Sequence, residues 1–238
     1  LGRVGNIGWN AARSRAQAQG SNLEAIAHTA TGKFEFGRLS LSATYRDIPA
    51  EFIGIESVGF RRNERGYQTD LSYRFSAISN FQASLSRLRV ASLNPLSSAF
   101  AASFTDADIQ SYTYAYTPQN GFQLTLNRNT NSTRTGNSRN EQTRDSISLA
   151  RAWKSFNFSM GYEQSNSDAL SSLGGGTRLK YRIRSWRTQL EWAVNSQLTL
   201  RSSAASSDIE QAGGANNTQT RSMDYSVVQQ CMHCGLCL

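Results

Sequence analysis

The sequence predicts an all-β chain in which antiparallel strands follow one another up and down as hairpins. The clearest hairpin is Thr113 to Asn127, where apolar and polar residues alternate with period 2 on both sides of Pro118-Gln119-Asn120-Gly121. Side chains on a strand point to opposite faces in turn, so each of these strands has one apolar and one polar face. Pro presets a turn, and Asn-Gly tolerates the positive φ of a tight hairpin. The unit recurs along the chain at intervals of about 40 residues, which indicates repeated supersecondary units.

The same alternation restarts after most of the short turns that the sequence predicts. These turns lie near Gly37, at Ser76 to Asn80, at Pro118 to Gly121, at Lys154-Ser155 and at Asn195-Ser196, and alternating runs follow at Leu39, Phe81, Phe122, Phe156 and Leu198. Ile7, Trp9 and Ala11 indicate one more strand near the start of the chain. We expect about 10–12 strands in all, each near the roughly 9–11 residues that a tilted membrane strand needs.

Long polar segments separate the hairpins and predict loops on the side opposite the short turns. They run from Asp47 to Gly66, Ala91 to Thr105, Asn129 to Arg144, Gln164 to Thr177 and Ser206 to Thr218. Hydrophobic residues make up 38% of the chain and the mean hydropathy is −0.50, which is low for a water-soluble protein with a thick core. No run approaches the roughly 18 apolar residues of a membrane helix, but a membrane barrel needs only every second residue to be apolar.

Short turns on one side and long loops on the other resemble bacterial outer-membrane β-barrels. The resemblance covers about residues 1–222 and implies an antiparallel up-and-down transmembrane β-barrel in the cell outer membrane, in contact with its lipid. An incomplete, open barrel is the alternative. Aromatic residues close to the short turns predict a girdle where hydrocarbon meets headgroups, although aromatics also favour strands in general. They are Phe34, Phe36, Phe75, Phe81, Phe122, Trp153, Phe156 and Trp192.

If the apolar face meets lipid, the polar face lines the interior. Lys180, Arg182 and Arg184 alternate with apolar residues, and each would cost about 2–4 kcal/mol at the membrane midplane, so they should face inward or stand above the membrane. We therefore expect a pore, receptor or uptake channel with a somewhat basic lumen that favours small anionic solutes. The alternative is a lumen closed by ion pairs to Asp70 and Glu163. The lumen-facing candidates are Arg46, Arg74, Gln123, Asn127, Asn157, Glu163, Lys180, Arg182 and Arg184.

The alternation changes phase in two places. Leu88 and Val90 are out of phase with Phe81, and Leu179 to Ile183 are out of phase with Leu190. A β-bulge shifts the alternation by one residue and is favoured at barrel rims. We expect either a bulge or a strand boundary at both places.

Composition and motifs point away from catalysis and from nucleic acid. The net charge of +8 comes from Arg residues spread over many strands and loops, so no nucleic-acid partner is expected. No G-x-S-x-G elbow is present and His28 has no nearby nucleophile motif, so we expect the barrel to have no enzymatic activity and no cofactor. Leu1 is not preceded by a basic and apolar leader, which suggests a mature chain or a fragment.

The last residues differ from the rest of the chain. Cys231, Cys234 and Cys237 have the C-x₂-C-x₂-C spacing of three iron–sulfur ligands, although C-x₂-C is also half of a zinc site. The segment resembles the start of the ferredoxin-type iron–sulfur subunits associated with glycolate oxidase. The resemblance implies that these cysteines are ligands of a 4Fe-4S cluster in a cytoplasmic electron carrier, with the fourth ligand missing here. We therefore divide the chain into a barrel, residues 1–222, and a truncated motif or junction tail, residues 223–238.

Three functions remain open at this point. The first is an outer-membrane channel, receptor or uptake protein. The second is an iron–sulfur electron carrier represented by the tail, and the third is a soluble or surface β-rich adhesin. The residues from about 217 to 228 also alternate, so they can form another barrel strand across the proposed junction near Met223.

Overall fold

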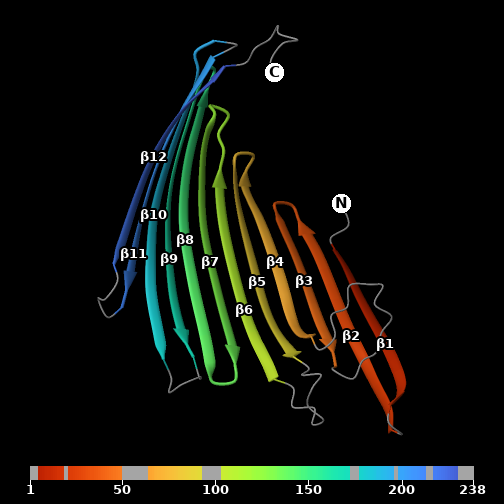
Figure 1. The fold of residues 1–238 in the computed structure, drawn as a ribbon. Coiled ribbons are helices and arrows are strands. Elements are labelled where there is room, and N and C mark those ends of the chain that lie inside the picture. Colours follow the sequence, from red (N-terminus) through yellow and green to blue (C-terminus); the bar gives the residue numbers. More distant parts are fainter. Residues whose placement is uncertain are drawn as a thin grey trace, which may run out of the picture.

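A computed structural model describes residues 5–18, 21–49, 64–92, 103–171, 177–195, 198–212 and 217–229. They form one antiparallel sheet of 12 strands that lie side by side in sequence order (Figure 1). The predicted fold class, an all-β antiparallel up-and-down sheet, is confirmed. β1 and β12 are the two edges of the described sheet and do not pair with each other. The strands are β1 (Gly5–Ala18), β2 (Ser21–Phe36), β3 (Leu39–Ile48), β4 (Glu64–Ser76), β5 (Ser79–Ser92), β6 (Ser103–Tyr116), β7 (Phe122–Thr135), β8 (Ser138–Trp153), β9 (Phe156–Leu170), β10 (Arg178–Ala193), β11 (Leu198–Gln211) and β12 (Thr218–Gln229).

The turns after β2, β4, β6 and β8 lie together at one end of the sheet, the upper end in Figure 1. The predicted hairpin is present as β6 and β7, with Gly121 at a φ of 75°. The side-chain oxygen of Asn120 accepts a hydrogen bond from the backbone N–H of Phe122 at 3.2 Å, which closes the turn locally. We call this end of the strands the turn half and the opposite end the loop half.

Strand register assigns every side chain to one of two faces, because directly paired residues share a face. We call the face of Leu124 and its partners the outer face, and that of Gln123 and its partners the inner face. Large apolar side chains on the outer face are widely exposed, with Leu126 and Met160 each at 39% and Trp192 at 46%. Among the described residues, the buried apolar side chains are Ala25, Ala27 and Ile48, so the sheet has no packed core. In the turn half, most of the large apolar side chains point away from the polar inner face.

The outer face of the turn half carries an apolar band. On β9 its outward residues are Phe156, Phe158, Met160 and Tyr162, and their partners on β10 are Trp192, Leu190, Thr188 and Trp186. Aromatic rings mark both borders. The ring centroids of Trp153 and Phe156 lie 5.3 Å apart at the turn end. Those of Tyr162 and Trp186 lie 4.4 Å apart at the border toward the loop half. Six residues of strand span about 20 Å, which with the rings approaches the roughly 25 Å apolar band of outer-membrane barrels.

The strands continue well past this band, and most have more than the 9–11 residues that we expected. Asn129 to Arg144 is not a loop: β7 runs to Thr135, β8 begins at Ser138, and Gly136 at a φ of 58° lies in the turn between them. The expectation was wrong because polarity was taken as a loop signal. A strand that extends beyond the hydrocarbon can be polar on both faces.

Neither expected explanation of the two phase changes, a β-bulge or a strand boundary, applies, because β5 and β10 continue through them. The register of β5 with β6 runs without a shift past Leu88 and Val90, and that of β10 with β9 runs without a shift past Ile183. The described register shift lies instead beside a short turn, between Arg74 and Ser76. The alternation inverts because the environment of the strand changes, not because the strand slips.

β12 passes through Met223 without a break, paired with Ala204 of β11. The alternative that the residues around Met223 form a further strand is therefore what the structure shows. The junction itself, a statement about the gene, stays a prediction. Cys231, Cys234 and Cys237 lie outside the described residues. Within the described part of the chain, no helix is long and apolar enough to cross a bilayer.

Candidate functional site: the polar inner face

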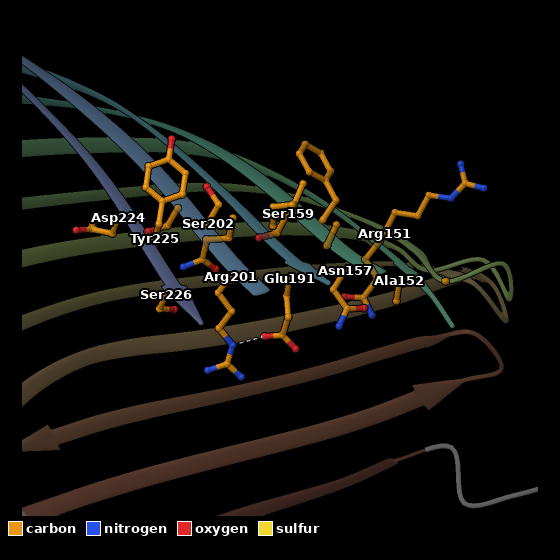
Figure 2. A pocket seen from close by; sticks show the side chains of 17 residues that line it. Arg151, Ala152, Asn157, Ser159, Glu191, Arg201, Ser202, Asp224, Tyr225 and Ser226 are labelled. Atoms are coloured by element: carbon orange, nitrogen blue, oxygen red, sulfur yellow. Dashed lines mark hydrogen bonds and ion pairs between the residues drawn. The ribbon is translucent and has the colours of Figure 1, made fainter. Parts of the chain in front are cut away.

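A hollow of about 560 Å³ lies over the turn half of β7 to β12 and is lined largely by inner-face residues (Figure 2). One row of paired residues crosses it, from Asn157 on β9 through Glu191 and Arg201 to Ser226 on β12. Arg201 donates from Nε to Glu191 Oε2 at 2.7 Å. In Figure 2 this pair points to one side of the sheet, and the labelled Tyr225 and Arg151 point to the other.

The next row toward the loops is also polar. Ser159, Gln189, Ser203 and Asp224 are paired across β9 to β12, and Gln123 lines the same hollow from β7. Apart from the Asp224 carboxylate, these residues carry amide and hydroxyl groups, which donate and accept hydrogen bonds and have no charge. This part of the inner face can therefore contact water and small polar solutes.

A second hollow of about 570 Å³ follows toward the loop half of β8 to β12. Arg144 on β8 forms an ion pair with Glu163 on β9, and Arg187 on β10 lies between serine-rich strands. A smaller inner-face hollow of about 220 Å³ lies over β3 to β6, where Asp70 accepts a hydrogen bond from Gln68 at 3.3 Å. Polar hollows thus occur on the inner face across most of the sheet.

Positive and negative charges balance on the inner face of the described strands. Six cations stand against six carboxylates: Lys33, Arg46, Arg74, Arg144, Arg187 and Arg201, and Glu35, Glu64, Asp70, Glu163, Glu191 and Asp224. Several of them form ion pairs with one another, such as Arg46 with Glu64 at 3.1 Å. The inner face has no net charge from these residues.

Six of the residues that the sequence analysis placed in a lumen lie on this inner face: Arg46, Arg74, Gln123, Asn127, Asn157 and Glu163. Lys180, Arg182 and Arg184 do not. They pair with Asp168, Asn166 and Gln164 of β9 and lie on the outer face, beyond the apolar band. The inward placement was wrong for these three because the polarity of β10 is inverted in its loop half, where the cations lie on the outer face.

The sequence analysis overlooked inner-face residues of β10 to β12. Arg187, Gln189 and Glu191 alternate with Thr188, Leu190 and Trp192, so the pattern to find them was present. They were overlooked because the phase of β10 was taken from its loop half, where the polarity is reversed.

No metal centre is found among the described residues, which contain no group of three His, Cys, Asp or Glu side chains able to hold an ion. His28 lies on the outer face, stacked on Trp9 at 5.8 Å between ring centroids. The iron–sulfur interpretation of the tail has no support from known proteins, because no family description and no curated protein sequence matches this chain.

Solved structures of outer-membrane proteins are similar to this chain. The chain is similar to a loop deletion mutant of OmpT, an outer-membrane protein of Vibrio cholerae, with 12% identity over 85% of this chain and 64% of that one, at a TM-score of 0.47. Outer-membrane expressed OmpT of Vibrio cholerae has 11% identity over 83% of this chain and 61% of its own, at a TM-score of 0.46. OmpT folded in vitro has 9% identity over 95% and 97% of the two chains, at a TM-score of 0.40. The chain spans less than two thirds of the first two structures, and the likeness concerns the fold alone.

These structures are described as outer-membrane proteins, the location that the sequence predicts for this chain. The expectation that the barrel is not an enzyme is withdrawn. It rested on missing motifs, and a site assembled from side chains of several strands leaves no local motif in the sequence. The likeness assigns no reaction to this chain.

Proposed function

We propose that this chain forms the wall of a water-filled pore or uptake channel in the outer membrane, with a polar and charge-balanced lumen. The observation that carries the proposal is the contrast between the two faces of the turn half. The outer face exposes large apolar side chains such as Leu126 and Trp192, while the inner face is built of Ser, Asn, Gln and paired charges. Exposed apolar side chains are stable in lipid, and a polar inner wall is stable in contact with water.

The edges β1 and β12 need partners for such a pore. In hydrocarbon, each unpaired backbone N–H or C=O costs several kcal/mol, so open sheet edges do not face lipid. The two edges therefore pair with each other or with further strands. Pairing of either kind encloses the inner face and separates it from the lipid.

The expected substrates are small polar solutes rather than anions in particular. The expected preference for anions rested on Lys180, Arg182 and Arg184, which lie on the outer face. Along the lumen wall that the described strands would form, cations and carboxylates are equal in number. We expect a permeability ratio of anions to cations near one.

Bilayer conductance with two charge variants tests the proposal. The full chain is folded into a planar bilayer, and the reversal potential is measured in a salt gradient. Glu191→Gln should shift the selectivity toward anions because Arg201 loses its partner, and Arg201→Gln should shift it toward cations. Lys180→Gln is the matched control, since it removes a charge from the outer face and should leave the reversal potential unchanged.

The ion pairs of the inner face favour one alternative, a barrel whose lumen is closed. Arg144 with Glu163 and Arg201 with Glu191 join neighbouring strands across that face. Heat-modifiable migration of a folded, membrane-inserted chain that passes no current would support this alternative and contradict the pore. A chain that stays soluble without detergent would contradict both.

A further inference from the structure

The outer face of β10 carries four successive cations in its loop half. Arg178, Lys180, Arg182 and Arg184 are spaced two residues apart, so all four point to the same side. We call them the cationic ladder. Their side chains are between 37% and 59% exposed, which leaves their charged groups accessible.

Two carboxylates beside the ladder are each shared by two of its cations. Asp168 Oδ2 on β9 lies 2.7 Å from Arg178 Nη2 and 3.3 Å from Lys180 Nζ. On β11, Glu210 Oε1 lies 3.1 Å from Arg184 Nη1, and Glu210 Oε2 lies 3.8 Å from Arg182 Nη1. Four cations against two carboxylates leave an excess of positive charge.

The surroundings preserve this excess. Asp208 lies opposite Arg184, and Arg221 lies on the outer face of β12. On β8, Arg139 and Glu141 form an ion pair with each other. The additional cations thus equal the additional carboxylates in number, and the ladder region stays net positive.

The ladder borders a hollow of about 540 Å³ on the outer face. Lys180 and Arg182 line it, together with Asp168, Glu210 and Asn166. Arg182 donates from Nε to the Asn166 side-chain oxygen at 3.0 Å, which holds the guanidinium at the rim of the hollow. The carboxylates and the amide therefore position the cations, while their excess charge remains available to a bound anion.

The apolar band begins directly next to the ladder on the same strand. Trp186 is 49% exposed and follows Arg184 on the same face, with Tyr162 beside it at 4.4 Å between ring centroids. Leu190 and Trp192 continue the apolar surface toward the turns. A molecule lying along β10 thus meets apolar side chains over one stretch and cations over the next.

We propose that the cationic ladder of β10 binds the phosphate headgroup of a membrane lipid whose acyl chains lie on the apolar band. Guanidinium groups bind phosphate oxygens through paired N–H donors, and basic clusters at the membrane surface recognise anionic headgroups. A lipid fits better than a free anion because the apolar contact surface is continuous with the cations. The proposal rests on the orientation in the membrane that the proposed function assigns.

Lipid selectivity in reconstituted vesicles tests it. The full chain is folded into phosphatidylcholine vesicles that contain a trace of spin-labelled phosphatidic acid or spin-labelled phosphatidylcholine. The immobilised fraction of each label gives the relative affinity of the protein for the phosphate monoester. Wild type should favour phosphatidic acid several-fold at low salt, and Arg182→Gln with Arg184→Gln, the two ladder cations nearest the apolar band, should reduce this preference about tenfold or abolish it.

The matched control removes the same charge from the inner face. Arg74→Gln with Arg187→Gln should keep the wild-type preference, because these residues lie on the other side of the sheet. An equal preference in wild type and in the ladder variant would overturn the proposal. So would displacement of the labelled lipid by inorganic phosphate at a similar concentration, which would indicate a site for free anions.

The failure of this proposal differs from that of the proposed function. A chain that inserts and conducts but shows no lipid preference contradicts the ladder site alone. A chain that selects phosphatidic acid but passes no current contradicts the pore alone. A chain that does not enter vesicles of any composition overturns both.

Discussion

The turn half and the loop half of the sheet are built from the same strands, but on some of these strands the polarity of the two faces is inverted between the halves. On β10, the turn half presents Leu190 outward and Glu191 inward, whereas the loop half presents Arg182 outward and Ile183 inward. β5 shows the same inversion, with Ala83 outward near the turn and Arg87 outward near the loops. The alternation of side chains is unbroken, so the change comes from what surrounds each half.

The inversion identifies the edge of the hydrocarbon. A cation on the outer face costs about 2–4 kcal/mol at the midplane and about 0–1 kcal/mol near the interface. Outward cations are therefore tolerated as soon as the strand leaves the acyl chains. Among the described strands, Arg151 is the exception in the turn half, and it lies close to the turn with its guanidinium 4.5 Å from the Trp153 ring centroid. A long side chain at the turn end of the strand can reach the lipid headgroups on the turn side of the membrane.

The loop half stabilises its outer face by ion pairs between strands. Arg89 donates two hydrogen bonds to the Asp106 carboxylate, at 2.6 and 3.1 Å. Arg65 Nε lies 3.5 Å from Asp47 Oδ2. The hydrogen bonds from Arg89 lower the pKa of Asp106. Exposed pairs of this kind contribute little each to stability because water screens them. Specificity of strand pairing is the main gain, since opposite charges across two strands favour the correct register.

The largest expected difference between the halves is the cost of one new outward cation. Leu124→Arg places a guanidinium in the apolar band and should lower the free energy of unfolding in vesicles by about 2–4 kcal/mol. Thr130→Arg adds the same group to the same face of β7 in the loop half and should cost at most about 1 kcal/mol. Denaturant titration of tryptophan fluorescence measures both.

Equal costs for the two variants would show that the halves share one environment. The assignment of the membrane boundary to the level of Tyr162 and Trp186 would then be wrong. A loss of heat-modifiable migration in the Leu124 variant alone would support the assignment independently.

The turn half could be predicted from the sequence almost completely. Phe122, Leu124 and Leu126 alternate with polar residues, and Asn120-Gly121 forms the turn, because lipid on one side and water on the other impose a two-residue period. The loop half could not be predicted from the sequence in this way. There both faces are polar or mixed, so the residues from 129 to 144 predict a loop although they form most of a hairpin with a two-residue turn.

The residues of the inner-face site could also be predicted only where apolar neighbours fix the phase of the strand. Gln123 and Asn157 follow from their apolar neighbours, which fix the phase of their strands. Lys180 and Arg182 were misplaced because the sequence shows the inversion of β10 but not its position relative to the membrane. Only the paired register with β9 decides on which side these cations lie.

The second prediction compares one glycine from each half. Gly121 has a φ of 75°, and an added Cβ would lie 2.4 Å from the carbonyl oxygen of Ala152. Gly136 has a φ of 58°, but an added Cβ would meet nothing within 4 Å. Gly136→Ala should therefore lower the free energy of unfolding only by the backbone strain, about 1–2 kcal/mol. Gly121→Ala should lower it further because the neighbouring strand must also move.

Equilibrium unfolding of both variants in the same vesicles ranks the two costs. A smaller effect at Gly121 than at Gly136 would mean that the turn half is the looser end of the sheet. That outcome would contradict the close packing of the β6–β7 turn against β8.

The smallest effect concerns the titration of the loop half. Two hydrogen bonds from Arg178, with a further contribution from Lys180, lower the pKa of Asp168 to about 2. A carboxylate with a lowered folded-state pKa stabilises the fold above its unfolded pKa of about 3.9, and this contribution is lost as the pH falls toward about 2. The stability of wild type relative to Asp168→Asn should therefore be constant above about pH 4 and decline between about pH 4 and 2. Because Asp168 is solvent-accessible, added salt should reduce the decline, and identical pH profiles of the two proteins at low salt would show that the loop half gains nothing from this ion pair.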